Sequence, residues 1–160
     1  MSTPVTIRPA TAADCDALVD LTRDLAGFHG HADAATITAA DIRRDAFGAR
    51  PIIWCWIAET GDRRPVGNVM VSDGYAAWLG HPIVVVNNLH VVEAMRGTGL
   101  GKRLIVEVAR FARSRGIPRM ELHVAGDNPA RAFYEHLGFR VRNDLRCRME
   151  AGAIERLAAS

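Results

Sequence analysis

The order of apolar and polar positions along the chain predicts strands and helices in turn. Alternating or continuous apolar runs predict strands, and apolar positions three to four residues apart predict helices. Strands are expected over Val5–Arg8, Ile52–Glu59, Val66–Ser72, Ile83–Val92, Arg119–Val124 and Leu145–Met149. Helices are expected from Thr11 to Gly27, Thr38 to Gly48, the glycine-rich segment to Gly116, Asn128 to Gly138, and Ala153 to Ala158. This order predicts a single α/β domain over residues 1–160.

Local signals support three of these elements. Thr11 and Thr38 are each followed three residues later by an aspartate, a variant of the capping box that begins helices. The segment Ile83–Val92 is the most apolar of the chain, which is typical of a strand buried on both faces. We therefore expect this segment, in the middle of the sequence, to be the core strand of the domain.

Composition narrows the class of protein without naming a function. The chain has 160 residues, 49% of them hydrophobic and 24% charged, and a formal net charge of +2. Such a balance requires neither a nucleic acid nor a membrane as partner. The three cysteines form no C-x-x-C pair, and the start of the chain lacks the pattern of a signal peptide. We expect a cytoplasmic protein without a metal site.

A glycine-rich segment, Arg96–Lys102, follows the central strand and precedes a predicted helix. Glycines at 97, 99 and 101 permit positive φ angles and close approach of a ligand to the backbone. The first N–H groups of a helix have no partner within it and carry partial positive charge. The segment therefore predicts a site for a diphosphate, with Arg96 and Lys102 adding full charges.

Three known phosphate-binding patterns compete for this segment. A Walker A motif fails because residue 103 is arginine where serine or threonine is required. A dinucleotide-binding fingerprint has Lys102 in place of its last glycine, although Glu121 lies at a suitable distance for a ribose-binding acid. The third pattern, Arg-x-x-Gly-x-Gly, is matched by Arg96, Gly99 and Gly101.

That third pattern belongs to the GNAT acetyltransferase superfamily, which the chain resembles. Leu89-His90-Val91 lies where the central strand of that family precedes the loop. Asn128–Phe139, with its Phe-Tyr and Gly-Phe pairs, is similar to the second signature of the family. Further segments, including Ile7–Cys15, Phe47-Gly48 and Trp78–Gly80, resemble the diamine (spermidine/spermine) acetyltransferase branch.

The resemblance implies a fold, a cofactor and a set of contacts. The fold would be a mixed, mostly antiparallel sheet of about seven strands, split after the central strand and flanked by about four helices. The cofactor would be acetyl-CoA, and the protein would be a homodimer. The implied CoA-binding residues are Leu89, His90, Val91, Arg96, Gly97, Thr98, Gly99, Leu100, Gly101, Lys102, Asn128 and Tyr134.

Acetyl transfer from a thioester to an amine needs an acid for the departing thiolate. Tyr134 is the candidate, because a phenol of pKa ~10 keeps its proton at neutral pH and can lend it to a thiolate of pKa ~8.5. By resemblance, Tyr134 stands beside the sulfur of CoA, and the backbone N–H of Leu89 or Val91 binds the thioester carbonyl. The alternative is that Tyr134 is a core aromatic residue.

The base is less obvious, because this chain departs from the diamine branch. Asn87 and Asn88 occupy the positions of an acidic pair, and an amide cannot accept the proton. Ordered water, His90 or Glu93 would then deprotonate the amine. If side chains alternate along the strand, His90 shares a face with Asn88, although a strand histidine also serves in packing.

The acceptor is expected to be a small primary amine, such as a diamine or an amino acid. Candidate contacts are Asn87, Asn88, Tyr75, Trp78 and Asp33; the two aromatic side chains could bind an amine by cation–π contact. Asp33 is the one acid of residues 28–36, which argues against a polyamine. Acetylation of a protein amine or an aminoglycoside, a non-catalytic CoA-binding module and a nucleotide-binding domain remain alternatives.

Overall fold

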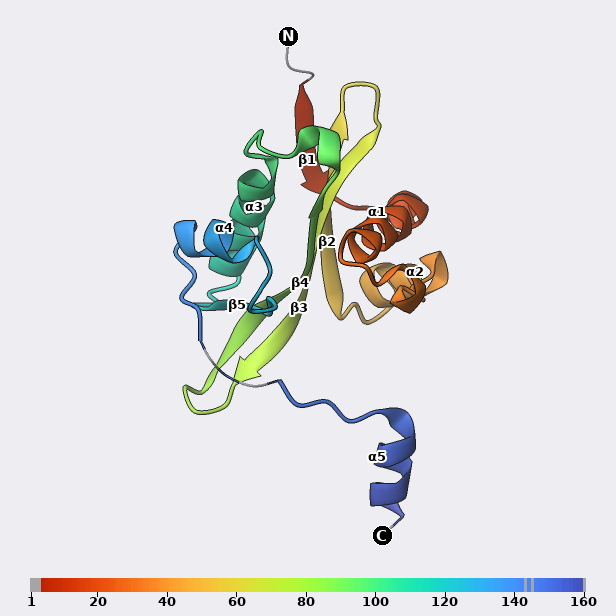
Figure 1. Ribbon diagram of the computed structural model, residues 1–160, viewed down its shortest axis with the longest axis vertical. Coiled ribbons are helices and arrows are strands. Elements are labelled where there is room, and N and C mark those ends of the chain that lie inside the picture. The colour runs from red at the N-terminus through yellow and green to blue at the C-terminus, as the bar shows by residue number, and fades with distance from the viewer. Residues whose placement is uncertain (1–3, 143, 145, 160) are drawn as a thin grey trace. The chain divides into compact units, whose positions relative to one another are not determined.

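The computed structural model describes residues 4–142, 144 and 146–159 (Figure 1). The chain forms two compact units, Met1–His123 and Val124–Ser160, which we describe separately. The first contains β1 (Val5–Pro9), α1 (Cys15–Phe28), α2 (Ala39–Phe47), β2 (Ile53–Thr60), β3 (Pro65–Ala76), β4 (His81–Val91), α3 (Leu100–Ser114) and β5 (Met120–Leu122). The second contains α4 (Arg131–His136) and α5 (Ala151–Ala158). That residues 1–160 act as one domain stays a prediction.

The strands form one mixed sheet in the order β1-β2-β3-β4-β5. The first four strands pair antiparallel in sequence, and β5 pairs parallel with β4. The expectation of a mixed, mostly antiparallel sheet is confirmed. β3 and β4 are longer than predicted, since they continue to pair from Asp73 with Val84 to Ala76 with His81.

The numbers implied by the resemblance are wrong: the described residues form five strands instead of about seven, and five α-helices instead of about four. The pattern of apolar residues predicted six strands and five helices, so its number of helices is confirmed. The strand predicted over 145–149 is one cause of the smaller number of strands. Leu145 lies outside the described residues, and residues 146–149 form no strand and are exposed. Alternation of arginine with apolar residues is not sufficient for a strand, because a strand also requires pairing with another segment.

The two predicted helix starts are confirmed. Asp14 accepts hydrogen bonds from the N–H and hydroxyl of Thr11, which begins a short 3-10 turn (Ala12–Asp14) ahead of α1. Asp41 does the same for Thr38 at the start of α2. These reciprocal bonds satisfy N–H groups that a helix leaves unpaired at its first turn.

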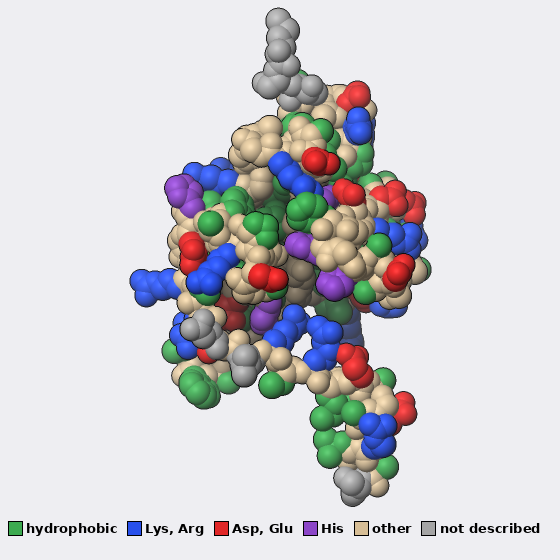
Figure 2. Space-filling view, viewed as in Figure 1, with side chains coloured by type: hydrophobic (Ala, Val, Ile, Leu, Met, Phe, Trp, Pro, Cys, Tyr) green, Lys and Arg blue, Asp and Glu red, His purple; other side chains and the backbone are tan. Residues whose placement is uncertain are grey.

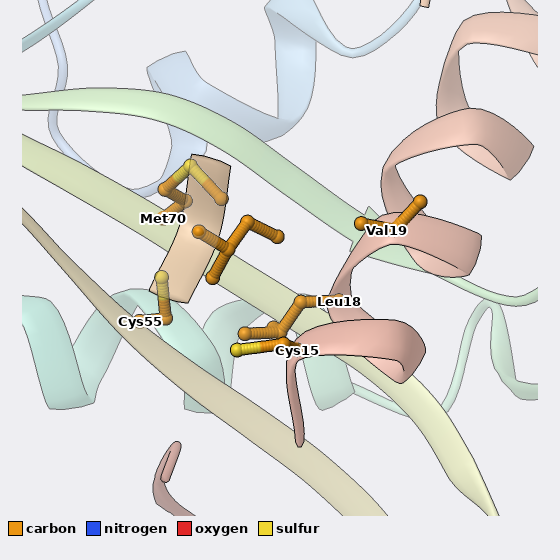
Figure 3. Packing of buried hydrophobic residues seen from close by; sticks show 6 residues of the cluster. Cys15, Leu18, Val19, Cys55 and Met70 are labelled. Carbon is orange, nitrogen blue, oxygen red and sulfur yellow. The ribbon is translucent and has the colours of Figure 1, made fainter. Parts of the chain in front are cut away.

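Helices cover both faces of the sheet, α1 and α2 on one and α3 on the other (Figure 1). A buried cluster between α1, α2 and the sheet consists of Cys15, Leu18, Val19, Ile42, Cys55 and Met70 (Figure 3). On the opposite face, α3 buries Leu100, Leu104, Ile105, Val108 and Ala112. Within the described residues no helix is long and apolar enough to cross a membrane.

Arg8 of β1 joins three elements through a network of charged hydrogen bonds. Its guanidinium donates to both carboxylate oxygens of Asp14 at 2.8 and 2.9 Å and to both of Glu59 at 3.1 and 3.0 Å. These bonds hold the pKa of Asp14 and of Glu59 below their usual values. The network fixes the start of α1 against the edge of the sheet.

Candidate active site

Strand β4, the fourth of the five in the sheet, contains a β-bulge at Asn87. Before it, Val86 pairs with Val71 of β3, and after it Asn88 pairs with Met70, so Asn87 has no counterpart. The bulge also marks the end of the pairing with β5, which covers Val84–Val86 in the described residues. Beyond the bulge, the second edge of β4 is therefore open, which is where the resemblance placed a split in the sheet.

The bulge changes the direction in which the backbone groups of β4 point. Before it, the N–H of Val84 donates to the carbonyl of Arg119, next to β5. After it, the N–H of Val92 donates to Val66 of β3. Because alternate residues of an antiparallel pair face the partner strand, the backbone of Leu89 and of Val91 points away from β3. Their N–H groups lie along the open edge.

Beyond the bulge, the side chains of Asn88 and His90 face α1. Asn88 lies opposite Met70, which lies opposite Cys55, and both of those belong to the core cluster under α1. Residues paired across strands share a face, and so do alternate residues of one strand. His90, two residues on, therefore shares this face with Asn88, as predicted, and its cross-strand partner Asn68 does too.

Two side chains of α1 hold these polar groups. The amide Nδ2 of Asn88 donates to the hydroxyl of Thr22 at 2.9 Å, and that hydroxyl donates to the carbonyl of Leu18. The Nε2 of His90 lies 2.7 Å from Oδ2 of Asp24. The imidazole is buried, with 2% of its side chain exposed, whereas the Asp24 side chain is 61% exposed.

The glycine-rich segment forms the turn that begins α3. Gly97 and Gly99 have φ angles of 76° and 82°, in the left-handed region that favours glycine. Gly99 is the N-cap residue of α3 and provides no side chain to cap it, and the first turn contains no acid. The hydroxyl of Thr98 donates to the carbonyl of Met95 and steadies the turn. Gly101 and Lys102 lie in the first turn of α3.

Arg96 connects this turn to the end of α1. Its Nε donates to the carbonyl of Val91 at 3.2 Å, and its guanidinium carbon lies 4.1 Å from the centre of the Phe28 ring. Phe28 is the last residue of α1 and is 57% exposed. Its ring packs against a cation instead of the core.

The second unit contains the other signature residues. Asn128 accepts a hydrogen bond from the N–H of Ala130 at 2.8 Å through its side chain, which shapes the turn before α4. Tyr134 on α4 makes edge-to-face contacts with the rings of Phe133 and Phe139. Burial raises the pKa of the Tyr134 phenol above its usual value.

Three candidate substrate contacts lie apart from the others. Tyr75 and Trp78 belong to the hairpin end of β3 and β4, and their exposed fractions are 65% and 101%. The partner of Tyr75, Pro82, precedes Asn88 by six residues, or about 20 Å of extended strand. Asp33 lies exposed in the 3-10 turn Ala32–Ala34 between α1 and α2. Their binding roles stay predictions.

We also searched the described residues for metal-ligand clusters, hollows and charged patches. In the part of the chain that the structure describes, no three His, Cys, Asp or Glu side chains are grouped as metal ligands. Two open hollows lie beside α3, of about 310 and 460 Å³, and neither is lined by Leu89, His90 or Val91. Acidic and basic side chains are interspersed over α1 and α2 (Figure 2).

Comparison with known proteins decides the family. The profile of the acetyltransferase (GNAT) family matches residues 18–139, which include the open edge of β4, the glycine turn and Tyr134. The chain belongs to the GNAT family and is an N-acetyltransferase.

Two relatives support the diamine branch of the GNAT family. The human spermidine/spermine N(1)-acetyltransferase-like protein 1 is 33% identical over a match that covers 66% of this chain and 16% of that protein. The thialysine N-epsilon-acetyltransferase of Sus scrofa is 32% identical, over 85% of this chain and 84% of the relative. The chain thus spans a small part of the first protein and most of the second.

Solved structures have the same GNAT fold. An integron cassette protein of Vibrio cholerae aligns with a TM-score of 0.79, covering 99% of this chain and 100% of that one at 22% identity. An acetyltransferase of Trypanosoma brucei gives 0.70, covering 92% and 100% at 23% identity. At these identities the likeness establishes the fold of the chain alone.

Three polar residues of this N-acetyltransferase were missed in the sequence. Thr22, Asp24 and Asn68 contact or adjoin the strand residues Asn88 and His90, yet the α1 pair lies 66 positions away in sequence. Asn68 had one usable signal, since it is an amide inside the otherwise apolar segment Val66–Val71. Nothing local distinguishes Asp24 from Asp16 and Asp20, which lie eight and four residues earlier on the same helix.

Proposed function

We propose that the chain transfers the acetyl group of acetyl-CoA to a primary amine of a small molecule, by direct attack in a ternary complex. One observation carries the proposal: the open edge of β4 runs into a glycine turn that begins α3 without a side-chain cap. The first feature suits a thioester carbonyl and the second a diphosphate, and CoA joins these two groups in one molecule.

The residues of the turn fit the diphosphate of CoA. The N-terminal N–H groups of α3 carry partial positive charge, and no acidic side chain of the first turn opposes an anion. Lys102 adds a charge in that turn, and Arg96 adds another just before it. Because Gly97 and Gly99 hold left-handed conformations, we expect a larger residue at either position to strain the turn.

The open edge of β4 fits the acetyl group. An N–H of Leu89 or Val91 would donate to the thioester oxygen and stabilise the negative charge that develops there during attack. The nitrogen of the amine forms a bond with the carbonyl carbon, the carbon–sulfur bond breaks, and the thiolate of CoA departs. The backbone supplies this stabilisation, so no side chain is required for it.

Tyr134 would return a proton to that thiolate. Burial raises the pKa of the phenol, so the group keeps its proton at neutral pH and has it available for the thiolate as negative charge develops on the sulfur. We expect Tyr134→Phe to lower kcat about tenfold or more while the affinity for CoA changes less than twofold, because the ring packing is kept. Unchanged kcat would remove Tyr134 from the mechanism.

The acceptor is a small amine, and the two relatives named for their substrates suggest its kind. One is named for thialysine and the other for spermidine or spermine. Asn87 and Asn88 offer no negative charge to a polyamine, and the Asn87 amide donates to Ser72. We therefore favour a short diamine or an amino acid with a side-chain amine over spermidine and spermine.

The test is thiol release from acetyl-CoA with four acceptors: thialysine, lysine, 1,3-diaminopropane and spermidine. Release that depends on thialysine, lysine or the diamine supports the proposal; activity confined to spermidine contradicts the acceptor class. A thermal shift with CoA, NAD and ATP checks the cofactor, since ligand at a hundred times its Kd adds ~2.7 kcal/mol of stability. A protein that binds CoA but releases no thiol is a sensor module instead.

We further propose that the protein is a cytoplasmic homodimer, as the resemblance to the diamine branch implies. The absence of a C-x-x-C pair and the burial of Cys15 and Cys55 as free thiols fit a reducing compartment. Light scattering coupled to size exclusion measures the mass in solution. A mass near the 17.4 kDa of one chain at micromolar concentration would contradict the dimer.

A further inference from the structure

A buried polar cluster lies between α1 and the sheet, beside the open edge of β4. Its sheet members are Asn68, Asn88 and His90, which are 0%, 8% and 3% exposed. Among the described residues, these three are the polar residues classed as buried. From α1, Thr22 contacts Asn88 and Asp24 contacts His90. Burying polar groups costs free energy unless they are hydrogen-bonded. A cluster of them beside the open edge of β4 therefore suggests a role in function.

The contact with Asp24 decides which nitrogen of His90 carries the proton. An ionised carboxylate only accepts hydrogen bonds, so the Nε2 that lies 2.7 Å from Oδ2 of Asp24 must be the donor. In a neutral imidazole the other nitrogen, Nδ1, then has a free lone pair. The contact with Asp24 therefore leaves Nδ1 of His90 able to accept a proton. The polar side chains beside His90 on the same face of the sheet, Asn68 and Asn88, are amides and cannot do so.

We propose that His90 is the base that takes the proton of the acceptor amine, and that Asp24 is the positioning residue that fixes its tautomer. The inference rests on the proposed function. His90 lies between Leu89 and Val91, one of whose N–H groups would bind the thioester carbonyl, so the base is adjacent in sequence to the residue that would hold that carbonyl. Because the His90 side chain lies on the face that α1 covers, the proton of the amine must reach it on that face.

The amides of the cluster provide a path for that proton. Both polar atoms of the Asn68 side chain and the Oδ1 of Asn88 lack a hydrogen-bond partner among the described residues. Asn68 is the cross-strand partner of His90, and Asn88 is two residues from it on the same face. Such unpaired buried groups commonly hold an ordered water. A water held here would connect the buried imidazole to the amine.

The proton balance is simple. The ammonium of the acceptor gives one proton, through the water, to Nδ1 of His90 and becomes a neutral amine. The amine then attacks the thioester carbon, as above. Its nitrogen loses a second proton as the amide forms, Tyr134 gives its proton to the departing thiolate, and exchange through solvent returns that second proton to Tyr134. The imidazolium is stabilised by the carboxylate of Asp24, and it returns its proton to solvent after the products leave. No oxidant, metal or further reactant is needed.

The kinetic test uses Asp24→Asn with thialysine, lysine, 1,3-diaminopropane and spermidine as acceptors. The amide can accept where the carboxylate did but offers no charge to an imidazolium, so kcat should fall about 10- to 100-fold while KM for acetyl-CoA stays unchanged. Asp24→Glu should restore part of kcat. Asp20→Asn, one turn earlier on α1, removes the same charge and should leave kcat within twofold.

A double variant and a spectrum separate positioning from mere stability. The double variant, with both His90→Gln and Asp24→Asn, should have nearly the same kcat as the single variant His90→Gln, since the two residues act as a unit. The ¹⁵N spectrum of the imidazoles, with His90 assigned by its loss in His90→Gln, should show a protonated Nε2 in the unchanged protein. In Asp24→Asn it should show a mixture of tautomers.

The outcomes distinguish the two proposals. If the unchanged protein transfers acetyl to one of the four amines and Asp24→Asn leaves kcat intact, the inference is wrong and the proposed function stands. A protonated Nδ1 on His90 in the unchanged protein would also overturn the inference. If the unchanged protein releases no thiol with any of the four, the proposed function fails and the inference fails with it.

Discussion

Two polar networks anchor α1, one at each end, and they differ in how completely their groups are paired. At the start of the helix, Arg8 donates two hydrogen bonds to Asp14 and two to Glu59. Near its end, Asp24 makes one bond to His90 and Thr22 makes one to Asn88, while both polar atoms of the neighbouring Asn68 have no partner within the described chain.

The difference indicates what each network is for. A network whose donors and acceptors are all used has a structural role, because further contacts would break existing bonds. A buried network with unused groups costs stability and persists where it does chemistry. We therefore assign the Arg8 network to the fold and the His90 network to acetyl transfer.

The largest expected effect comes from His90→Gln. Removing the base should lower kcat about 100-fold, which corresponds to ~2.7 kcal/mol of transition-state stabilisation. Arg8→Ala, at the other network, should leave kcat per folded molecule within twofold. Steady-state kinetics on both variants test the assignment, and equal losses of kcat would contradict it.

Arg8→Ala should instead lower the free energy of unfolding by about 2 kcal/mol, because it leaves two carboxylates without their charged partner. Arg8→Lys should recover only part of this, since an ammonium cannot make two forked contacts at once. Urea unfolding measures both variants. A loss from Arg8→Ala no larger than that from Asp20→Asn would show that the network contributes little.

The Arg8 network should also make the protein sensitive to acid. Its bonds lower the pKa of Asp14 and Glu59 in the folded state, so their stabilisation is complete above the unfolded pKa of about 4 and is lost as pH falls further. Melting curves from pH 7 to pH 3 should show a steeper fall for the unchanged protein than for Arg8→Ala. Parallel curves would contradict this.

Asn68→Leu should have the smallest effect on stability. The change removes two unpaired buried polar atoms, so the free energy of unfolding should stay within about 1 kcal/mol or rise. kcat should nevertheless fall a few-fold, because the leucine cannot hold water beside His90. A variant that is clearly destabilised with kcat unchanged would show that Asn68 has a structural role.

The sequence was sufficient for features that depend on neighbouring residues. The capping boxes at Thr11 and Thr38 and the apolar stripe of α3 are local, and the structure confirms them. The bulge at Asn87 and the contact of Asp24 with His90 were not predictable, because each depends on the pairing of distant segments. The strand predicted at 145–149 failed for the same reason, since alternation cannot reveal whether an edge is available.

The most direct test of acetyl transfer follows the acetyl group itself. The protein is incubated with acetyl-CoA labelled with ¹³C at the carbonyl and with thialysine, lysine or 1,3-diaminopropane, and the carbon is observed by NMR. We predict that the thioester signal gives way to an amide signal on at least one of these amines. Conversion to free acetate alone, or persistence of the thioester although CoA binds, would contradict the account.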